Sequence, residues 1–305
     1  MADGLAIGTV TARRRGTMIA LALAAIAIWA GTPAVTKLAV GALDALAVGA
    51  LRTLIAAAVA LPLVFLAGLR PPRSPAGRVF LAVSGISGFA LFPVLFSFGV
   101  ARTSAGHSAL ILAVLPIFTG FIAALLERRR PVGRWWAGAA IALVGTYLLV
   151  DARFGLAGAG ATLEGDLIVL LSCIFASSGY VAGARAAREV SAWAVSLWGL
   201  IIGALVLLPL VALSVPLAPF LDAGWPVWTA LFYLAVIVSI VGYAAWYRAL
   251  ALDDIGRTGL LQFVQPLFSV VIAVLLLGET VTWSMALSGL VILFGVALVQ
   301  FQRRL

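Results

Sequence analysis

Ten long apolar stretches dominate this chain of 305 residues. A helix that crosses the hydrocarbon core of a bilayer needs about 20 mostly apolar residues in a row. Hydrophobic residues make up 64% of the sequence and charged residues 10%, whereas soluble domains have roughly 45–50% and about 25%. A soluble fold of this length has too little interior for that surplus. The composition therefore excludes a soluble enzyme, a disordered chain and a disulfide-rich secreted domain.

The apolar stretches predict the topology of a membrane protein. They lie at residues 17–37, 44–68, 78–100, 105–127, 131–151, 166–186, 192–214, 226–250, 257–278 and 282–301. The connections between them are too short for an extramembrane domain, and the longest, at 152–165, is rich in Gly and Ala and is typical of a flexible loop. We therefore expect an all-α membrane protein with ten transmembrane helices.

The basic residues indicate how the chain is oriented. Sixteen Lys and Arg residues fall on the side that holds both termini, three fall on the other side, and Arg52 lies within a span. Because loops rich in Lys and Arg are retained in the cytoplasm, both termini are expected to be cytoplasmic, in an inner (plasma) membrane of bacterial type. The net charge of +9 comes from these loop clusters, so no nucleic-acid partner is expected.

The two halves of the sequence resemble each other. VLPIF at 114–118 matches VQPLF at 264–268, and ALPLVFL at 60–66 matches LLPLVAL at 207–213. Each half holds five spans, and because five is odd the second half enters the membrane from the opposite face. We predict two inverted five-helix repeats around a central cavity, a plan that favours alternating access. Their bounds are 1–151 (with a basic tail, 1–16) and 166–305, joined by the loop 152–165.

Several short motifs occur in a characteristic order along the chain. They are Trp29 and Lys37 in the first span, Leu51-Arg52 in the second, Pro116, Pro266, and Leu277-Gly278-Glu279 before the last span. In order and spacing the chain resembles the EamA-type drug/metabolite transporter superfamily, which implies a basket-like bundle that exports small metabolites. Gly99 and Gly106 also resemble a glycine pair of the YddG-type aromatic amino acid exporters, and the second half has Ala249 and Gly256 there.

Polar residues on single helix faces indicate the transport path, because backbone groups in lipid are satisfied within their own helices. Thr258, Gln262, Gln265 and Ser269 form such a stripe on the ninth span; hydrogen bonding between helices is the alternative role. The candidate substrate-binding residues are Trp29, Ser87, Phe92, Phe96, His107, Ser177, Tyr180, Tyr243, Trp246, Tyr247, Gln262 and Gln265. An aromatic cavity with hydroxyls, amides and few charges suits a neutral or zwitterionic solute of amino-acid size.

Ionisable residues within spans are functional candidates. Arg52 lies about 12 Å deep, eight residues beyond Asp44 at 1.5 Å per residue, and has either a structural or a substrate role. His107 is a satisfied interfacial residue, a substrate donor or a proton site, and Lys37 and Glu279 are solvated, paired or gating groups. No Asp or Glu lies near the centre of a predicted span, which favours facilitated export; proton coupling would have to use His107 or an acid at the end of a span.

Two prolines and three glycines are candidate hinges and gates. Pro116 and Pro266 lie near the middle of spans four and nine, where each removes one backbone hydrogen bond and permits a kink. With Gly99, Gly106 and Gly256 as hinges, spans three and four would form one gate and spans eight and nine the other. The alternative is that the prolines only shape static packing.

The sequence favours a carrier that exports aromatic and other neutral amino acids or similar metabolites, functional as a monomer. The alternatives are a multidrug or nucleobase-like solute exporter of the same fold, a channel-like passive pore, and an intramembrane enzyme. An enzyme is not expected, because no nucleophile–base–acid set, metal-ligand cluster or phosphate loop is present. No cofactor or metal is expected, and the single cysteine, Cys173, excludes disulfides. The expected partners are a small-molecule substrate and the lipid bilayer.

Overall fold

The computed structural model describes residues 2–128, 130, 133–150, 160–214, 222–252 and 261–300. Within these ranges the chain forms helices and no strand, and every predicted span contains helix. We number the spans 1 to 10 in chain order. Seven of them are long and apolar enough to cross a membrane, and Gln265–Leu277 and Trp283–Leu298 are shorter apolar helices. The prediction of an all-α membrane protein is confirmed.

The first half contains spans 1 to 5, and three of these are interrupted helices. In chain order its elements are α1 (Ala2–Ala30), α2 (Thr32–Val40), α3 (Ala45–Leu66), α4 (Pro75–Ser84), the π-helix η1 (Gly85–Leu91), α5 (Phe92–Arg102), α6 (Ala105–Leu112), α7 (Leu115–Leu126) and α8 (Gly133–Val150). Span 1 comprises α1 and α2, span 3 comprises α4, η1 and α5, and span 4 comprises α6 and α7.

The second half contains spans 6 to 10. Its elements are α9 (Leu163–Ala186), α10 (Ala192–Ser214), α12 (Trp225–Phe232), the π-helix η3 (Tyr233–Gly242), α13 (Tyr243–Leu252), the 3₁₀ turn η4 (Leu261–Val264), α15 (Gln265–Leu277) and α16 (Trp283–Gln300). Span 8 therefore contains a π-helical segment, as span 3 does. In span 9, α15 begins directly before Pro266, and in span 4, α7 likewise begins directly before Pro116.

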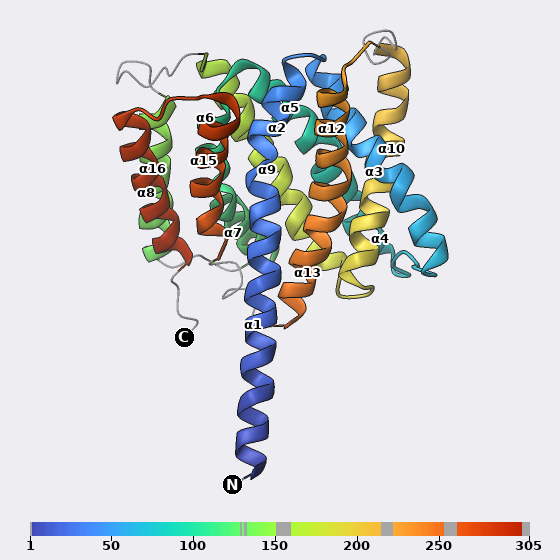
Figure 1. The fold of residues 1–305 in the computed structure, drawn as a ribbon. Coiled ribbons are helices and arrows are strands. Elements are labelled where there is room, and N and C mark those ends of the chain that lie inside the picture. The colour runs from blue at the N-terminus through green and yellow to red at the C-terminus, as the bar shows by residue number, and fades with distance from the viewer. Residues whose placement is uncertain are drawn as a thin grey trace.

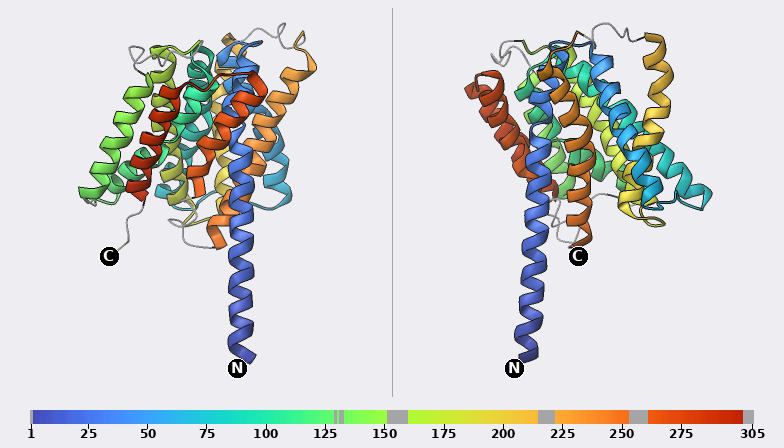
Figure 2. Two further views of the ribbon diagram at one scale, coloured as in Figure 1. Left: turned by 60° about the vertical axis from the view of Figure 1, so that its left-hand side comes forward. Right: turned by 45° about the vertical axis from the view of Figure 1, so that its right-hand side comes forward.

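The two halves pack as inverted repeats. The repeat mates α3 and α10 lie side by side on one flank of the bundle, and α8 and α16 lie side by side on the other (Figure 1). Members of each pair run in opposite directions, because the second member of each pair comes five spans after the first and five is odd. In the right-hand view of Figure 2, α16 (red) lies toward one edge of the bundle and α10 (yellow) toward the other, with α1 (blue) between them. This arrangement is the two-repeat plan predicted from the sequence.

The repeat extends to the irregular segments. The π-helices begin at Gly85 and Tyr233, 148 residues apart, and α7 and α15 begin at Leu115 and Gln265, 150 residues apart. Pro116 and Pro266 therefore occupy the first turn of a new helix, where a missing N–H removes no intrahelical bond. Each proline marks a break between two helical segments, which is a stronger interruption than the kink predicted at mid-span.

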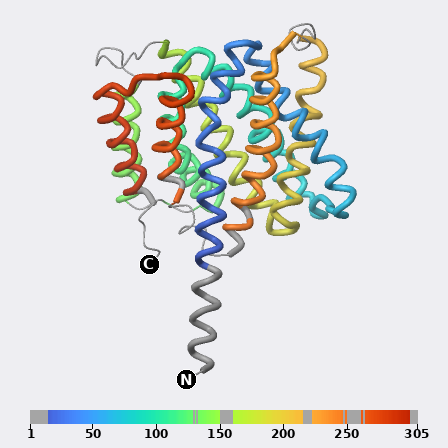
Figure 3. The backbone as a smooth tube through the Cα atoms, viewed as in Figure 1, coloured from blue at the N-terminus to red at the C-terminus, as the bar shows by residue number. Residues whose placement is uncertain are grey.

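The outside of the bundle is apolar. Phe65, Leu66 and Leu213, near the ends of α3 and α10, are 69%, 84% and 89% exposed. Large exposed side chains of this kind suit contact with lipid. Trp225 and Trp283, at the starts of α12 and α16, are also exposed at one face of the bundle, as expected of interfacial anchors. The tube of Figure 3 shows that the described part of α1 rises from the face at which α16 ends.

Candidate functional site

Five aromatic side chains meet in the interior of the bundle, and we call them the aromatic cluster: Trp29, Phe89, Tyr180, Tyr243 and Trp246. The ring centroid of Trp29 lies 5.1 Å from that of Tyr243 and 5.5 Å from that of Trp246. The Tyr243 ring lies 5.6 Å from Phe89 and 6.4 Å from Tyr180. These separations are typical of favourable aromatic pairs. The cluster joins the two halves, because Trp29 and Phe89 come from the first and the other three from the second.

A narrow pocket lies beside the aromatic cluster. It is lined by Ser84, Gly88, Phe89, Phe92, Ala176, Gly179, Tyr180 and Tyr243. Part of its wall is backbone, since a Cβ added to Gly179 would lie 2.7 Å from the Cα of Gly88. The hydroxyl of Ser84 donates to the carbonyl of Gly179 at 3.0 Å. Spans 3 and 6 therefore touch through their backbones at the pocket, where small residues permit close approach.

The two π-helices bring residues to this pocket. Gly88 and Phe89 lie within η1, and Tyr243 directly follows η3. π-helical turns are found mostly as short interruptions of α-helices and are frequent at functional sites. Spans 3 and 8 are therefore interrupted at equivalent positions of the two repeats, and both interruptions lie at the pocket that the two halves line together.

A buried charge lies next to the aromatic cluster. Arg52 of α3 is 4% exposed, and its Nη2 donates to the hydroxyl oxygen of Ser239 at 3.5 Å, beyond the usual range of such bonds. Its Nε and Nη1 have no hydrogen-bond partner among the described residues. The electrostatic neighbours of the guanidinium are the phenol groups of Tyr243 and Tyr180. A charged group is thus buried within the bundle with incomplete hydrogen bonding.

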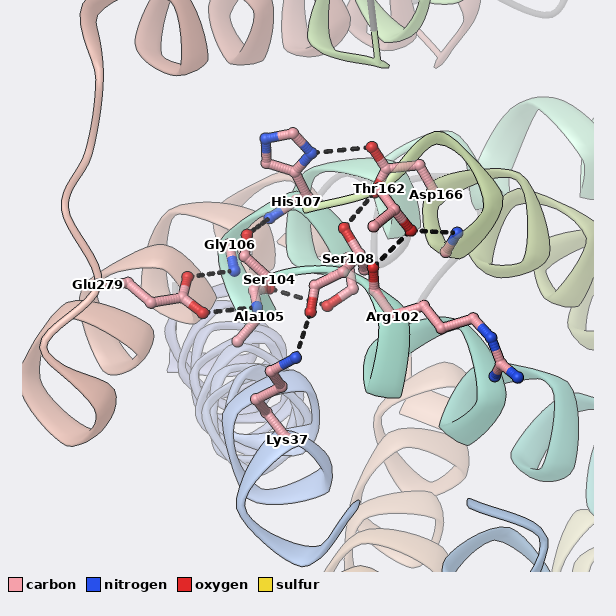
Figure 4. A network of polar contacts seen from close by, with 12 residues as sticks. Lys37, Arg102, Ser104, Ala105, Gly106, His107, Ser108, Thr162, Asp166 and Glu279 are labelled. Atoms are coloured by element: carbon pink, nitrogen blue, oxygen red, sulfur yellow. Dashed lines mark hydrogen bonds and ion pairs between the residues drawn. The ribbon is translucent and has the colours of Figure 1, made fainter. Parts of the chain in front are cut away.

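A second polar region lies where α2, α5, α6, α9 and the start of α16 meet, opposite the face at which α1 begins. Because the sequence predicts that both termini are cytoplasmic, we call this face the outer face and the opposite one the inner face. The polar region is the outer network, shown in Figure 4. Its members are Lys37, Arg102, Thr103, Ser104, Ala105, Gly106, His107, Thr162, Glu164, Asp166 and Glu279. They come from spans 1, 3, 4 and 6 and from the connection between spans 9 and 10.

Two charged side chains hold the turn between α5 and α6 from either side. The Glu279 carboxylate accepts hydrogen bonds from the N–H groups of Ala105 at 2.7 Å and Gly106 at 2.8 Å, so a negative charge lies at the N-terminus of α6, where the helix dipole favours it. Lys37 Nζ donates to the carbonyls of Val100 at 3.0 Å and Thr103 at 2.6 Å. These carbonyls lie at the C-terminus of α5, where the helix dipole favours a positive charge.

The deepest part of the outer network is centred on Asp166. Its Oδ2 lies 2.9 Å from Nδ1 of His107, and the two side chains are 2% and 3% exposed. The hydroxyl of Thr103 donates to the other carboxylate oxygen. Ser104 caps α6, since its hydroxyl oxygen accepts the N–H of His107 at 3.0 Å. Both carboxylate oxygens therefore have partners, and span 6 is joined to spans 3 and 4.

The opposite, inner face carries the corresponding charges in a more open arrangement. Arg185 Nη2 lies 3.2 Å from Glu127 Oε1, with the two side chains 22% and 35% exposed. Arg185 follows Lys37 by 148 residues and Glu279 follows Glu127 by 152, close to the offsets of the repeat. An acid and a base from equivalent positions thus serve each end of the molecule: they contact each other at the inner face and bind backbone groups of the turn between α5 and α6 at the outer face.

An exposed contact also ties the inner loops. Ser74 donates to Glu189 from its hydroxyl and from its backbone N–H, the latter at 3.2 Å. These hydrogen bonds lower the pKa of the Glu189 carboxyl below its usual value of 4.5. The contact joins the start of α4 to the turn between α9 and α10.

The predicted substrate residues fall into three groups in the structure. Trp29, Tyr180, Tyr243 and Trp246 belong to the aromatic cluster, and Phe92 lines the pocket. Five further candidates lie outside the cluster and the pocket. Ser87 is buried in η1, and the ring of Phe96 packs against that of Phe92 with 5.5 Å between centroids. His107 belongs to the outer network, Gln265 is the first residue of α15, and Ser177 contacts span 4. The side chains of Tyr247 and Gln262 lie outside the described residues.

Ser177 and Cys173 support the break in span 4. The hydroxyl of Ser177 donates to the carbonyl of Leu115 at 3.1 Å and accepts from Thr119 at 3.1 Å. The thiol of Cys173 lies 3.9 Å from the carbonyl of Ile111. Polar groups from a neighbouring helix can satisfy backbone groups at such an interruption within a membrane. Here α9 supplies them on both sides of the break.

The candidate hinge glycines lie at close helix contacts. A Cβ on Gly99 would lie 2.6 Å from Cγ2 and 2.8 Å from N of Val169, and one on Gly106 would lie 3.1 Å from a Glu279 oxygen. Neither glycine has a positive φ, so close packing is enough to explain both residues. Their hinge role stays a prediction, as does that of Pro116 and Pro266, and Gly256 lies outside the described residues.

Some residues of the site were not among the candidates. Phe89 lines the pocket from within the π-helical turn, which helical periodicity does not predict. Asp166 lies near the start of span 6, and its partner His107 is 59 residues away, so nothing local signals the pair. Arg52, by contrast, was already a functional candidate, because a charge eight residues inside a span is unusual.

Comparison with known proteins agrees with this architecture. The sequence model of the EamA-like transporter family matches residues 16–151 and again residues 163–301. The chain belongs to the EamA-like transporter family. The match occurs twice along the chain, once in each half.

Relatives of this EamA-like protein are also transporters. It is 28% identical over 276 residues to the uncharacterized transporter YdeK of Bacillus subtilis (strain 168), covering 89% of this chain and 93% of YdeK. It is 25% identical to a probable amino-acid metabolite efflux pump of Salmonella typhimurium, covering 90% and 91% of the two chains. A probable terminal-alkyne amino-acid exporter of Streptantibioticus cattleyicolor is 24% identical, with 70% and 69% covered.

A solved crystal structure shares the fold. It superposes with a TM-score of 0.63 and 22% sequence identity over 93% of this chain and 96% of its own. The correspondence of fold extends over almost the whole chain, and the family match makes the protein a multi-pass membrane transporter of two-repeat architecture.

Proposed function

We propose that this EamA-like transporter exports small neutral or zwitterionic metabolites by alternating access, and that aromatic and other neutral amino acids are its main substrates. The observation that carries the proposal is the position of the pocket: it is bordered by aromatic side chains from both halves and adjoins the π-helical interruptions of repeat-mate spans. A site shared by two inverted repeats is the arrangement from which both sides of a membrane can be reached in turn.

The polar contacts at the two faces supply the gating elements. The outer network closes one end around the turn between α5 and α6, while the equivalent acid and base at the inner end form a half-exposed pair. The charged residues at the two ends occupy equivalent positions of the repeat: Lys37 and Glu279 at the outer end, Arg185 and Glu127 at the inner end. In the opposite state, Arg185 and Glu127 would therefore become buried, and Lys37 and Glu279 would become exposed.

The lining of the pocket supports the substrate class. Rings such as Tyr243 and Phe89 offer apolar contact, and the lining also carries the hydroxyl groups of Tyr180 and Ser84. Relatives bear the names amino-acid metabolite efflux pump and amino-acid exporter, which supports the same class. The distribution of Lys and Arg supports an inner membrane location with both termini in the cytoplasm, and the names of these relatives support outward transport.

Counterflow in proteoliposomes tests the proposal. Vesicles containing the purified protein and preloaded with unlabelled solute should take up the labelled solute faster than empty vesicles, with and without a pH gradient. Amino acids, nucleobases and cationic drugs form the panel, and we expect phenylalanine and other neutral amino acids to respond. Preloading that has no effect on the uptake of a permeant solute would indicate a pore, and the alternating-access proposal would then be wrong.

A further inference from the structure

The unsatisfied guanidinium at the centre of the bundle is the feature that the proposed function does not explain. Arg52 is buried on α3, within a span that has an exposed apolar outer surface. Among the buried side chains of the described ranges that lack a partner, Arg52 alone carries a charge. Ionisable groups at such depth normally pair with one another or with backbone carbonyls, because solvation by water is lost.

Among the residues that the structure describes, none provides an anion for Arg52. Its electrostatic neighbours are the neutral phenols of Tyr243 and Tyr180, and Ser239 is its hydrogen-bond partner, at 3.5 Å. The hydroxyl of Ser239 itself donates to the carbonyl of Leu234 at 2.8 Å, so its proton is already used. Of the acids that the structure describes, none forms an ion pair with Arg52. The positive charge therefore has no counter-ion among the described residues.

The geometry of the guanidinium specifies what that ligand would carry. A guanidinium is planar and can hold the two oxygens of a carboxylate along one edge, through Nη2 with either Nε or Nη1. Each of these edges includes one of the two unpartnered nitrogens of Arg52. One positive charge balances one carboxylate, whereas a phosphate dianion would leave an uncompensated negative charge in a buried site.

We propose that Arg52 binds the carboxylate of the transported solute, so that the substrates are aromatic or apolar carboxylates, α-amino acids among them. The inference rests on the proposed function and deepens it. The carboxylate lies on the guanidinium beside Ser239, and the apolar part lies against the rings of Tyr243 and Phe89. An α-ammonium group, where present, is accommodated over the aromatic faces, which attract cations. The carboxylate is the required group and the ammonium is not.

A series of four related solutes tests which group is required. In counterflow, phenylalanine and 3-phenylpropionate, which both have a carboxylate, should compete with labelled phenylalanine. Phenethylamine and phenylalaninamide, which lack it, should compete at least about tenfold more weakly, because each loses a charge-assisted hydrogen-bond pair. Phenyl phosphate should not compete. Equal competition by phenethylamine or phenylalaninamide would overturn the role of Arg52 and leave the carrier function intact.

Substitution of Arg52 separates a binding role from a structural one. Arg52→Met should lower the uptake of phenylalanine by about 10- to 100-fold and remove the preference for carboxylates. The same variant should melt at the same or a higher temperature than the wild type, because replacing a poorly paired buried charge with an apolar side chain is neutral or stabilising. Arg52→Lys, which keeps the charge, should recover part of the uptake.

The exposed Arg70 provides the matched control, and Arg70→Met should keep the wild-type solute preference. A markedly lower melting temperature for Arg52→Met would overturn the proposal, because the arginine would then hold the fold together. The proposal would also be overturned if the wild-type protein showed counterflow of nucleobases or cationic drugs but of no carboxylate, although that result would confirm a carrier. If no solute of any class shows counterflow, the alternating-access function fails, and the carboxylate site fails with it.

Discussion

The centre of the outer network and the surroundings of the aromatic cluster are both buried, yet their charged groups differ in how completely they are hydrogen-bonded. In the outer network both oxygens of Asp166 and both oxygens of Glu279 accept hydrogen bonds. Beside the aromatic cluster, Arg52 has a long hydrogen bond at one nitrogen and none at the other two. Saturated groups hold neighbouring helices together, whereas an unsatisfied charge in a buried site is suited to bind something that arrives.

The comparison also separates stability from function. Breaking a saturated buried pair leaves a charge without its partner, so it destabilises the fold. Removing an unsatisfied charge relieves a burial penalty, so it leaves the fold intact and affects only what binds there. The two regions should thus respond to substitution with effects of opposite sign on stability, and the predictions below start with the largest effect.

The strongest effect is expected at the centre of the outer network. Asp166→Ala leaves the Thr103 hydroxyl and the His107 ring without their acceptor and should lower the free energy of unfolding by about 3–5 kcal/mol. Denaturant titration in detergent micelles measures the change. Glu164→Ala is the matched control in the same turn of α9, because Glu164 is 69% exposed in its pair with Arg102, and it should change stability by less than about 1 kcal/mol. Equal effects of the two substitutions would remove the distinction between buried and exposed pairs.

The next effect concerns the close approach of α5 and α9 that brings the network together. Gly99→Ala would place a Cβ 2.8 Å from the backbone N of Val169 and 2.9 Å from the carbonyl O of Gly165, and should destabilise the protein by about 1–3 kcal/mol. Gly16→Ala, where no atom lies within 4 Å of the added Cβ, should leave the protein unchanged or more stable. Thermal unfolding of the two variants gives the comparison. If Gly99→Ala keeps its stability and changes only the transport rate, Gly99 is a hinge and not a packing contact.

A smaller effect is expected where a charge meets a helix terminus. Glu279→Gln keeps the shape of the side chain and removes the negative charge beside the N–H groups of Ala105 and Gly106, so it should cost about 1 kcal/mol. Equilibrium unfolding at low and high salt measures this contribution. If the substitution leaves stability unchanged at both salt concentrations, the carboxylate does not stabilise the start of α6.

The smallest effect belongs to the exposed contact between Ser74 and Glu189. Because hydrogen bonds from Ser74 depress the pKa of Glu189 in the folded state, the contact stabilises the protein above the usual pKa of 4.5, and this contribution is lost as the pH falls below it. Glu189→Gln should make the stability of the protein slightly less dependent on pH in this acidic range. Parallel pH titrations of the melting temperature for the wild type and the variant would detect the difference, and superimposable curves would contradict it.

Most of the fold could be predicted from the sequence, because length and apolarity decide which segments cross a bilayer. The ten stretches and the matched prolines also fixed the inverted plan, since an odd number of spans per repeat permits no other. The π-helices were not predictable, because Gly85–Leu91 and Tyr233–Gly242 are apolar segments whose hydrogen-bond register depends on the helices packed against them. Pro116 and Pro266 signalled an interruption but did not reveal that a new helix begins there.

The site was predicted in part, for a related reason. Trp29, Tyr180, Tyr243 and Trp246 share helix faces with polar residues, and this local pattern was sufficient to choose them. The pairing of His107 with Asp166 joins two spans, and periodicity within one helix carries no information about such contacts. The depth of Arg52 in the membrane could be predicted from its position in the second span. Its incomplete hydrogen bonding could not, because that depends on all the helices packed around it.

Labelling of a cysteine in the pocket tests most directly whether the outer network is a gate. Ala176→Cys, in a background carrying Cys173→Ser, places a single thiol in the pocket lining, and a membrane-impermeant maleimide can be applied from the outer face. With the network intact the thiol should react slowly from that face, and Asp166→Asn should speed the reaction. Equal rates from the outer face with and without Asp166→Asn would show that the network does not close the path.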